Sequence, residues 1–164
     1  MEIAVRKFDN KKDRCAYVLS QIEALLNEEK DMTAGLANAS AVMNLLLPDL
    51  NWVGFYMMRG NGLVLGPFQG KPAVSHIAIG AGVCGTAAQS GDAQLVLDVH
   101  VHCNHIACDL ASASELVLPI RANGALYALL DMDSPVTGHF DNEDLIGLQP
   151  VADAIGWWIS QIGV

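Results

Sequence analysis

Residues 114–133, which read SELVLPIRANGALYALLDMD, contain the clearest fold signal in the chain. Two apolar segments, 115–121 and 125–131, flank the pair Asn123-Gly124. This dipeptide between alternating apolar residues is the strongest short-range signal for a β-hairpin with a tight turn. The sequence therefore predicts two adjacent antiparallel strands in this region.

Three acidic residues lie near the open end of this predicted hairpin. Asp131 and Asp133 alternate along one strand, so both side chains face the same side of the sheet. The turn lies almost midway between Glu115 and Asp131, so strand pairing brings Glu115 close to both aspartates. Acidic residues at a strand end are usually a solvated edge. Three converging acids that border strongly apolar strands favour a shared binding site instead.

The rest of the chain predicts helices at both ends and short strands between them. Apolar residues at helical spacing predict helices over 13–27 and 33–47, with Thr33 as the N-cap of the second and Pro48 as its end. A glycine-rich turn followed by a short helix is expected at 80–91. Strands are predicted at 51–58, 63–68, 74–79 and 95–98, and an irregular segment at 99–112.

A closing helix is predicted from its cap Asp141 through Gln161, and Pro150 inside it predicts a kink or a boundary near Gln149. The strands follow one another too closely for crossover helices, which favours antiparallel pairing. We therefore expect an α+β fold with a mostly antiparallel sheet of about six strands, and a single domain over residues 1–164.

The composition narrows the class of protein. Of 164 residues, 52% are apolar and 16% are charged, which predicts a well-buried globule, and the net charge of -9 argues against nucleic-acid binding. No apolar stretch approaches the ~20 residues that span a bilayer, and the N-terminus lacks a signal-peptide pattern. We expect a soluble cytoplasmic protein whose four cysteines are thiols, metal ligands or catalytic groups rather than structural disulfides.

The segment after residue 97 is unusually rich in possible metal ligands. Their density would suit zinc, but no repeated C-x-x-C or paired H-x-x-x-H spacing accompanies it, so we expect no metal. The residues concerned are Asp98, His100, His102, Cys103, His105 and Cys108.

Seven ordered segments between residue 51 and about residue 141 resemble signatures of the free methionine-(R)-sulfoxide reductases. The resemblance implies a GAF fold, with a central antiparallel sheet and terminal helices packed on one face. The segments are NWVGFY (51–56), LGPFQGKPA (65–73), GVCGTAA (82–88), LVLDVH (95–100), HIACD (105–109), SELVLPI (114–120) and DMDSP (131–135).

The resemblance implies that Cys108 is the nucleophile and that Cys84 resolves the oxidised enzyme. Many members carry a further cysteine where this chain has Val74, and Cys103 lies where the family usually has none. The oxidised Cys108 could therefore be reduced by Cys84, by Cys103 or directly by an external dithiol reductant. The family precedent favours Cys84. The NH-rich turn before Cys84 could stabilise a thiolate or receive a substrate carboxylate. Cys15, within the first helix, is expected to be inert.

The resemblance also assigns a substrate pocket. Glu115, Asp131 and Asp133 match substrate-binding carboxylates, which suit the ammonium group of a free amino acid, and one of them with a raised pKa could protonate the sulfoxide oxygen. Trp52 and Tyr56 are four residues apart on one strand, so they share a face and could enclose the methyl group. Ordinary core aromatics would give the same pattern.

The sequence thus favours an enzyme that reduces free L-methionine-(R)-sulfoxide to L-methionine through a thiolate, a sulfenic acid and a disulfide. No organic cofactor is expected, and the reductant would be a thioredoxin-type dithiol. No nucleic-acid or membrane partner is expected, and homodimerisation is left open. The alternative is a non-catalytic GAF module that binds a small ligand or senses redox state.

Overall fold

The hairpin around Asn123-Gly124 is present in the computed structural model, which describes residues 3–101 and 111–163. Its two strands are β5 (Ser114–Ala122) and β6 (Ala125–Ser134). Asn123 and Gly124 both have positive φ angles, as a tight hairpin turn requires. The other strands are β1 (Trp52–Arg59), β2 (Gly62–Gly70), β3 (His76–Ala78) and β4 (Gln94–Val96).

All six strands form one antiparallel sheet in the order β3-β2-β1-β6-β5-β4. The two predicted hairpins, β1–β2 and β5–β6, are joined side by side through β1 and β6. The predicted α+β class and antiparallel sheet are confirmed. The strand expected at 74–79 is shorter, since only His76–Ala78 pairs with β2.

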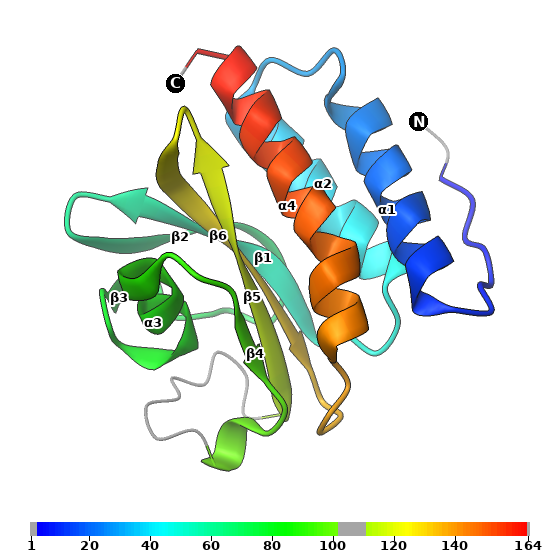
Figure 1. Ribbon diagram of the computed structural model, residues 1–164. Coiled ribbons are helices and arrows are strands. Elements are labelled where there is room, and N and C mark those ends of the chain that lie inside the picture. Colours follow the sequence, from blue (N-terminus) through cyan, green and yellow to red (C-terminus); the bar gives the residue numbers. More distant parts are fainter. Residues whose placement is uncertain (1–2, 102–110, 164) are drawn as a thin grey trace.

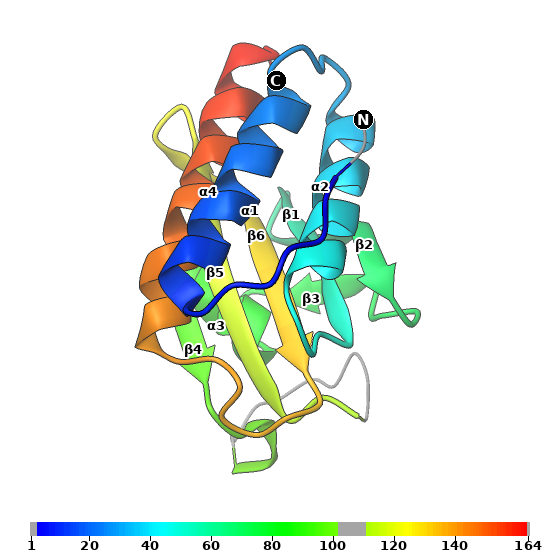
Figure 2. The same cartoon turned by 90° about the vertical axis from the view of Figure 1, so that its right-hand side faces the viewer.

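Three helices lie on one side of the sheet, where two pack on the strands and the N-terminal one packs against those two, as Figures 1 and 2 show. They are α1 (Lys11–Leu26), α2 (Met32–Leu46) and α4 (Asn142–Gln161). Their apolar sides bury a large core against alternate residues of the strands, including Val53, Phe55 and Leu118. The expected packing of the terminal helices on one face is therefore confirmed. Within the described ranges, no helix is long and apolar enough to cross a membrane.

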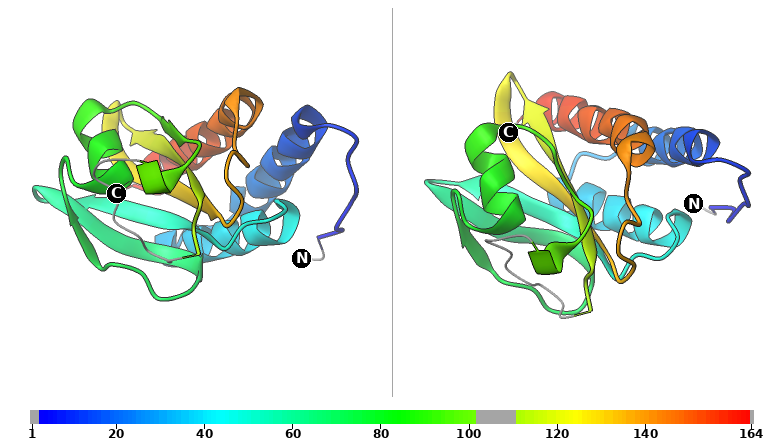
Figure 3. Two further views of the ribbon diagram at one scale, coloured as in Figure 1. Left: turned by 90° about the horizontal axis from the view of Figure 1, so that it is seen from below. Right: turned by 60° about the horizontal axis from the view of Figure 1, so that its bottom comes forward.

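The opposite face of the sheet carries α3 (Gly82–Ser90), which Figure 3 shows from two further directions. A second, smaller apolar cluster lies beneath it and includes Trp52, Tyr56 and Val117. Because alternate strand residues face opposite ways, the residues between those of the large core line this second face. The candidate site lies here, away from the three large helices.

Two expected helix boundaries differ from the structure. The N-cap of α2 is Asp31, whose carboxylate accepts a hydrogen bond of 2.8 Å from the Ala34 amide, so the assignment of Thr33 was wrong. The closing helix is continuous from Asn142 to Gln161, so no boundary occurs near Gln149. Pro150 and Ile146 are both on the exposed side of α4. Water can therefore satisfy the carbonyl that lacks a partner because proline has no N–H.

Candidate active site

The floor of the candidate site is the face of the sheet that α3 covers. Across the strands, one row of neighbours contains Trp52 of β1, Asp133 of β6 and Glu115 of β5. The adjacent row places Gly54 of β1 beside Asp131 of β6. All three carboxyl side chains are buried, with at most 5% exposed. The prediction that hairpin pairing brings the three acids together is confirmed.

Helix α3 brings Cys84 to this floor. A side chain at Gly85 would place its Cβ 2.5 Å from the carbonyl oxygen of Ala78, so glycine lets the first turn of α3 lie close against β3. The sulfur of Cys84, a carboxyl oxygen of Glu115 and one of Asp131 all lie within 4.8 Å of one another. A thiol and two carboxyls from three separate elements thus form one buried group.

Burial dominates the electrostatics of this group. It raises the pKa of the Cys84 thiol well above its usual value, and the charges of Asp131 and then Glu115 raise it further. Burial likewise raises the pKa of Asp131 and of Glu115 well above the ordinary carboxyl range. Desolvation and the nearby carboxyls therefore act against ionisation of the Cys84 thiol, in the opposite direction to the NH-rich turn. A thiolate at Cys84 stays a prediction.

A small cavity separates these side chains from the start of α3. Its volume is about 10 Å³, which is room for about one water molecule, and Ile77, Val83, Cys84, Glu115 and Asp131 contribute to its lining. The Oδ1 oxygen of Asp131 is buried and has no hydrogen-bond partner within residues 3–101 and 111–163. A buried acceptor of this kind is suited to receive a donor or a cation from a bound molecule.

Two predicted aromatic residues form a wall beside the acids. Trp52 and Tyr56 are fully buried, and their rings stack with centroids 6.0 Å apart. The Trp52 indole donates a hydrogen bond to the Lys71 carbonyl at 3.2 Å, and this bond fixes the ring. Phe68 stacks on Trp52 at 5.2 Å and was missed, although it lies in the quoted segment LGPFQGKPA.

The position of the absent cysteine borders this wall. The Tyr56 hydroxyl donates a hydrogen bond of 2.9 Å to the carbonyl oxygen of Val74, whose side chain is 36% exposed. Residue 74 is thus held at the edge of the aromatic wall, and a side chain there is accessible to solvent. The substitution to valine removes a thiol from this edge.

Cys103 and Cys108 lie outside the described residues, as do His102 and His105. The described residues on either side of them are hydrogen-bonded to each other. The amide of Val99 donates a hydrogen bond of 2.9 Å to the carbonyl of Ala113, two residues before Glu115. Val99 and Ala113, which lie on either side of residues 102–110 in the sequence, are therefore joined close to the start of β5.

The other part of the His- and Cys-rich stretch gives no support for zinc. Asp98 accepts a hydrogen bond of 2.9 Å from the amide of His100, and the His100 side chain is exposed. Within the described ranges, the one group of three potential metal ligands is Cys84, Glu115 and Asp131. Cys15 is buried between α1 and α4, and burial raises its pKa to about 11, in keeping with an unreactive thiol.

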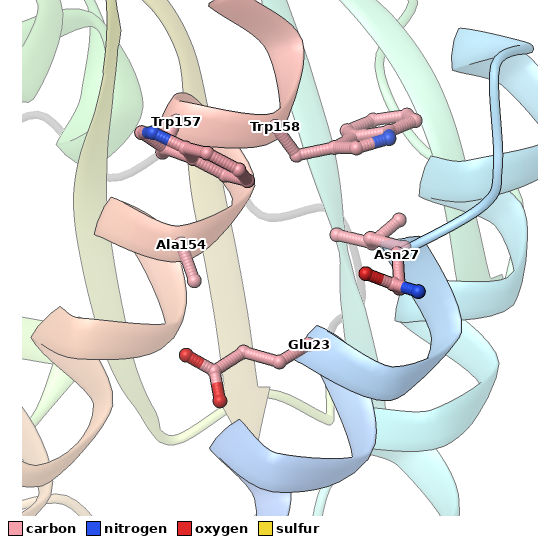
Figure 4. A pocket seen from close by; sticks show the side chains of 6 residues that line it. Glu23, Asn27, Ala154, Trp157 and Trp158 are labelled. Atoms are coloured by element: carbon pink, nitrogen blue, oxygen red, sulfur yellow. The ribbon is translucent and has the colours of Figure 1, made fainter. Parts of the chain in front are cut away.

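A separate surface pocket of about 280 Å³ lies between α1 and α4. Figure 4 shows Glu23 of α1 and the C-cap residue Asn27 on one side of it, and Ala154, Trp157 and Trp158 of α4 on the other. It opens on the helical side of the sheet and contains no cysteine. Cys84, Glu115 and Asp131 are on the other face of the sheet, so this pocket is not part of the candidate site.

The sheet order, with the terminal helices on one face and a buried thiol and carboxyls on the other, is that of a GAF-domain protein. The GAF domain family model matches residues 13–159. The chain is 46% identical over 140 residues to the free methionine-R-sulfoxide reductase of Escherichia coli (strain K12), which covers 85% of each chain. It is 38% identical over 154 residues to the free methionine-R-sulfoxide reductase of Saccharomyces cerevisiae, which covers 89% of this chain and 86% of the yeast protein.

A solved structure agrees with these relatives. The X-ray structure of the free methionine-R-sulfoxide reductase from Neisseria meningitidis, in complex with its substrate, matches with a TM-score of 0.91 and 37% identity. The match covers 98% of this chain and 99% of that one. This chain therefore belongs to the free methionine-R-sulfoxide reductase family.

Proposed function

We propose that this protein reduces free L-methionine-(R)-sulfoxide to L-methionine, with Cys108 as the nucleophile. The observation that carries the proposal is the buried group of Cys84, Glu115 and Asp131 beside an aromatic wall, in a chain of this family. A soft nucleophile is needed at sulfur and a proton at the departing oxygen, and this group offers both a thiol and acids.

The proposed reaction has three steps. The Cys108 thiolate attacks the sulfoxide sulfur, and with one proton the oxygen passes to Cys108, leaving methionine and a cysteine sulfenic acid. The Cys84 thiol then displaces that oxygen as water and forms a Cys84–Cys108 disulfide. An external dithiol reduces the disulfide and restores both thiols. Cys103, or the external dithiol acting directly, is the alternative for the second step.

The acids would divide two tasks between them. Ionised carboxylates among Glu115, Asp131 and Asp133 would bind the substrate ammonium, with which they form charge-assisted hydrogen bonds. The raised pKa of Glu115 and of Asp131 supports a protonated acid near neutral pH that can donate to the sulfoxide oxygen. Trp52 and Tyr56 would pack against the methyl end of the substrate.

Substrate binding requires movement at this site. The cavity beside Cys84 and Asp131 holds about one water molecule, which is far less than an amino acid. Phe68 is only partly buried where it stacks on Trp52, so its ring is the described side chain best placed to move.

The chemistry also limits the partners. A thiol–disulfide cycle consumes one external dithiol per turnover, so we expect a thioredoxin-type reductant in the cytoplasm and no organic cofactor or metal for turnover.

The direct test is a coupled assay of NADPH consumption with thioredoxin, thioredoxin reductase and free L-methionine-(R)-sulfoxide. We expect turnover with the R epimer and none above background with the S epimer or a sulfoxide-containing peptide. A site that encloses both the ammonium and the carboxylate leaves no exit for a peptide chain. Tight binding of the free R epimer without any NADPH consumption, with a known reductase as positive control, would favour the sensor alternative.

A further inference from the structure

We propose that Cys84, Glu115 and Asp131 form a binding site for a soft divalent cation such as Zn²⁺. The binding of the cation depends on these three residues alone. The effect of the cation on turnover rests on the proposed function, because the cation would occupy the place assigned to the substrate ammonium and would bind Cys84. The site would make the enzyme sensitive to free zinc.

The ligand atoms are already assembled. The Cys84 sulfur and one oxygen each from Glu115 and Asp131 lie within 4.8 Å of one another. A tetrahedral zinc ion has bonds of about 2.0–2.3 Å, so its ligand atoms are about 3.3–3.6 Å apart. Small side-chain rotations would close the difference. A sulfur with two carboxylate oxygens is a donor set that suits zinc and leaves a fourth position for water.

A second observation points to a missing ligand. The Oδ1 oxygen of Asp131 is buried without a hydrogen-bond partner within the described part of the chain, and Asp131 is only 2% exposed. Asp131 also lines the cavity of about 10 Å³, which has room for one ion or water molecule but not for a larger group. A cation would satisfy this oxygen and offset the charge of buried carboxylates.

The scaffold holds the three ligands on separate, fixed elements. Glu115 and Asp131 lie on the paired strands β5 and β6, and Cys84 lies in the first turn of α3. The contact of Gly85 with Ala78 fixes that turn against the sheet edge. Sites built on strands and helices keep their geometry better than sites on loops.

The test uses Co²⁺ as a spectroscopic probe and purified full-length protein, kept reduced with a phosphine under nitrogen. We expect one Co²⁺ per chain, with a near-ultraviolet thiolate-to-cobalt charge-transfer band that Zn²⁺ displaces and Mg²⁺ does not. The band should disappear in Cys84→Ser, and Asp131→Asn should weaken Co²⁺ affinity roughly tenfold or more. Cys15→Ser, which removes a buried thiol from the other core, is the matched control and should keep the band.

A Cys103→Ser/Cys108→Ser double variant separates this site from the His- and Cys-rich segment. The double variant should retain the charge-transfer band. If the double variant loses the band while Cys84→Ser keeps it, the proposal is overturned. Thermal unfolding of the wild-type protein is the second measurement, since it does not depend on any variant folding. Zn²⁺ should raise its Tm and Mg²⁺ should not. Absence of both the band and the Tm shift would contradict the site, whatever the NADPH assay shows.

Discussion

Glu115 lies directly opposite Asp133 across the β5–β6 ladder, and both side chains are buried. Two like charges in this position repel, and water is not available to screen them. Burial first, and the charge of Asp133 second, therefore raise the pKa of Glu115 well above its usual value. The pairing thus places two buried carboxyl groups side by side, an arrangement that favours the protonated form of Glu115.

Asp131→Asn should lower kcat/KM for free methionine-(R)-sulfoxide by roughly ten- to a hundredfold. The change keeps the shape of the side chain but removes a charge and an acid from the ammonium site, a loss of about 1–3 kcal/mol. Steady-state NADPH oxidation measures it. Asp153→Asn, an exposed acid on α4, is the control and should match the wild type. Equal kinetics for Asp131→Asn and the wild type would exclude Asp131 from substrate binding.

Gly54→Ala should weaken both stability and substrate binding. A Cβ at residue 54 would overlap the Cβ of Phe68 and lie 2.8 Å from both the Phe68 Cα and the Trp52 ring. Overpacking of this kind costs about 1–3 kcal/mol, and here it displaces the aromatic wall. Chemical denaturation and KM report the two effects.

Gly62→Ala is the matched control for that change, because its Cβ would meet only the Ile77 carbonyl oxygen, at 3.2 Å. It should have a smaller effect on stability and leave KM unchanged. If Gly54→Ala also leaves KM unchanged, the aromatic wall does not contact the substrate.

Lys11→Met should destabilise the fold at neutral pH by about 1 kcal/mol, as expected for a partly exposed ion pair. The Lys11 ammonium donates to Asp141 at 2.8 Å and also contacts Asp144, and so ties the start of α1 to the start of α4. The hydrogen bond from Lys11 is the main reason that the pKa of Asp141 lies below its usual value.

The pH dependence of this effect has a definite sign. A carboxyl whose pKa is lowered on folding adds stability above its unfolded pKa, about 4, and loses it as pH falls through the folded value. The Tm difference between wild type and Lys11→Met should therefore be largest near neutral pH and shrink below about pH 4. Lys12→Met, a change at the exposed neighbouring residue, should show no such trend. A constant difference at all pH values would mean that Lys11 acts through packing.

Oxidation by one equivalent of substrate should produce a Cys84–Cys108 disulfide. Val74 supplies no thiol, and Val99 is hydrogen-bonded to Ala113 beside the start of β5, the strand that carries Glu115. Blocking of free thiols, digestion and mass spectrometry would identify the bridge. A Cys103–Cys108 bridge would assign resolution to Cys103, and no bridge would favour direct reduction by the external dithiol.

Local patterns in the sequence were enough to predict several elements. Asn123-Gly124 marked the hairpin that brings Glu115 near Asp131, and Asp141 marked the start of α4. These signals depend on neighbouring residues. The sequence did not reveal the register shift between Ile120 and Arg121, which puts Glu115 opposite Asp133. The features that the sequence did not reveal depend on distant contacts. The short helix at 80–91 was predicted, but its packing of Cys84 against the acids was not, and Phe68 reaches Trp52 only because Gly54 leaves space between the strands. The raised pKa of the Cys84 thiol is likewise a result of burial, which spacing along the chain does not reveal.

The choice of Asp31 rather than Thr33 as a helix cap shows a different limit. Both residue types cap helices, and a shift of two positions along the chain leaves the apolar face almost unchanged in pattern. Pro150 is tolerated because it lies on the exposed side of α4, and exposure is again a property of the folded chain.

The measurement that tests the central claim most directly is the methionine released per chain in a single turnover. Pre-reduced protein is mixed with excess free L-methionine-(R)-sulfoxide, without an external reductant, and the methionine is quantified. We expect about one methionine per chain from the wild type and from Cys84→Ser, because both retain the Cys108 thiolate for attack at sulfur. Cys108→Ser should release none, since a hydroxyl is a poor nucleophile toward sulfur. Release of methionine by Cys108→Ser at the wild-type level would contradict the account.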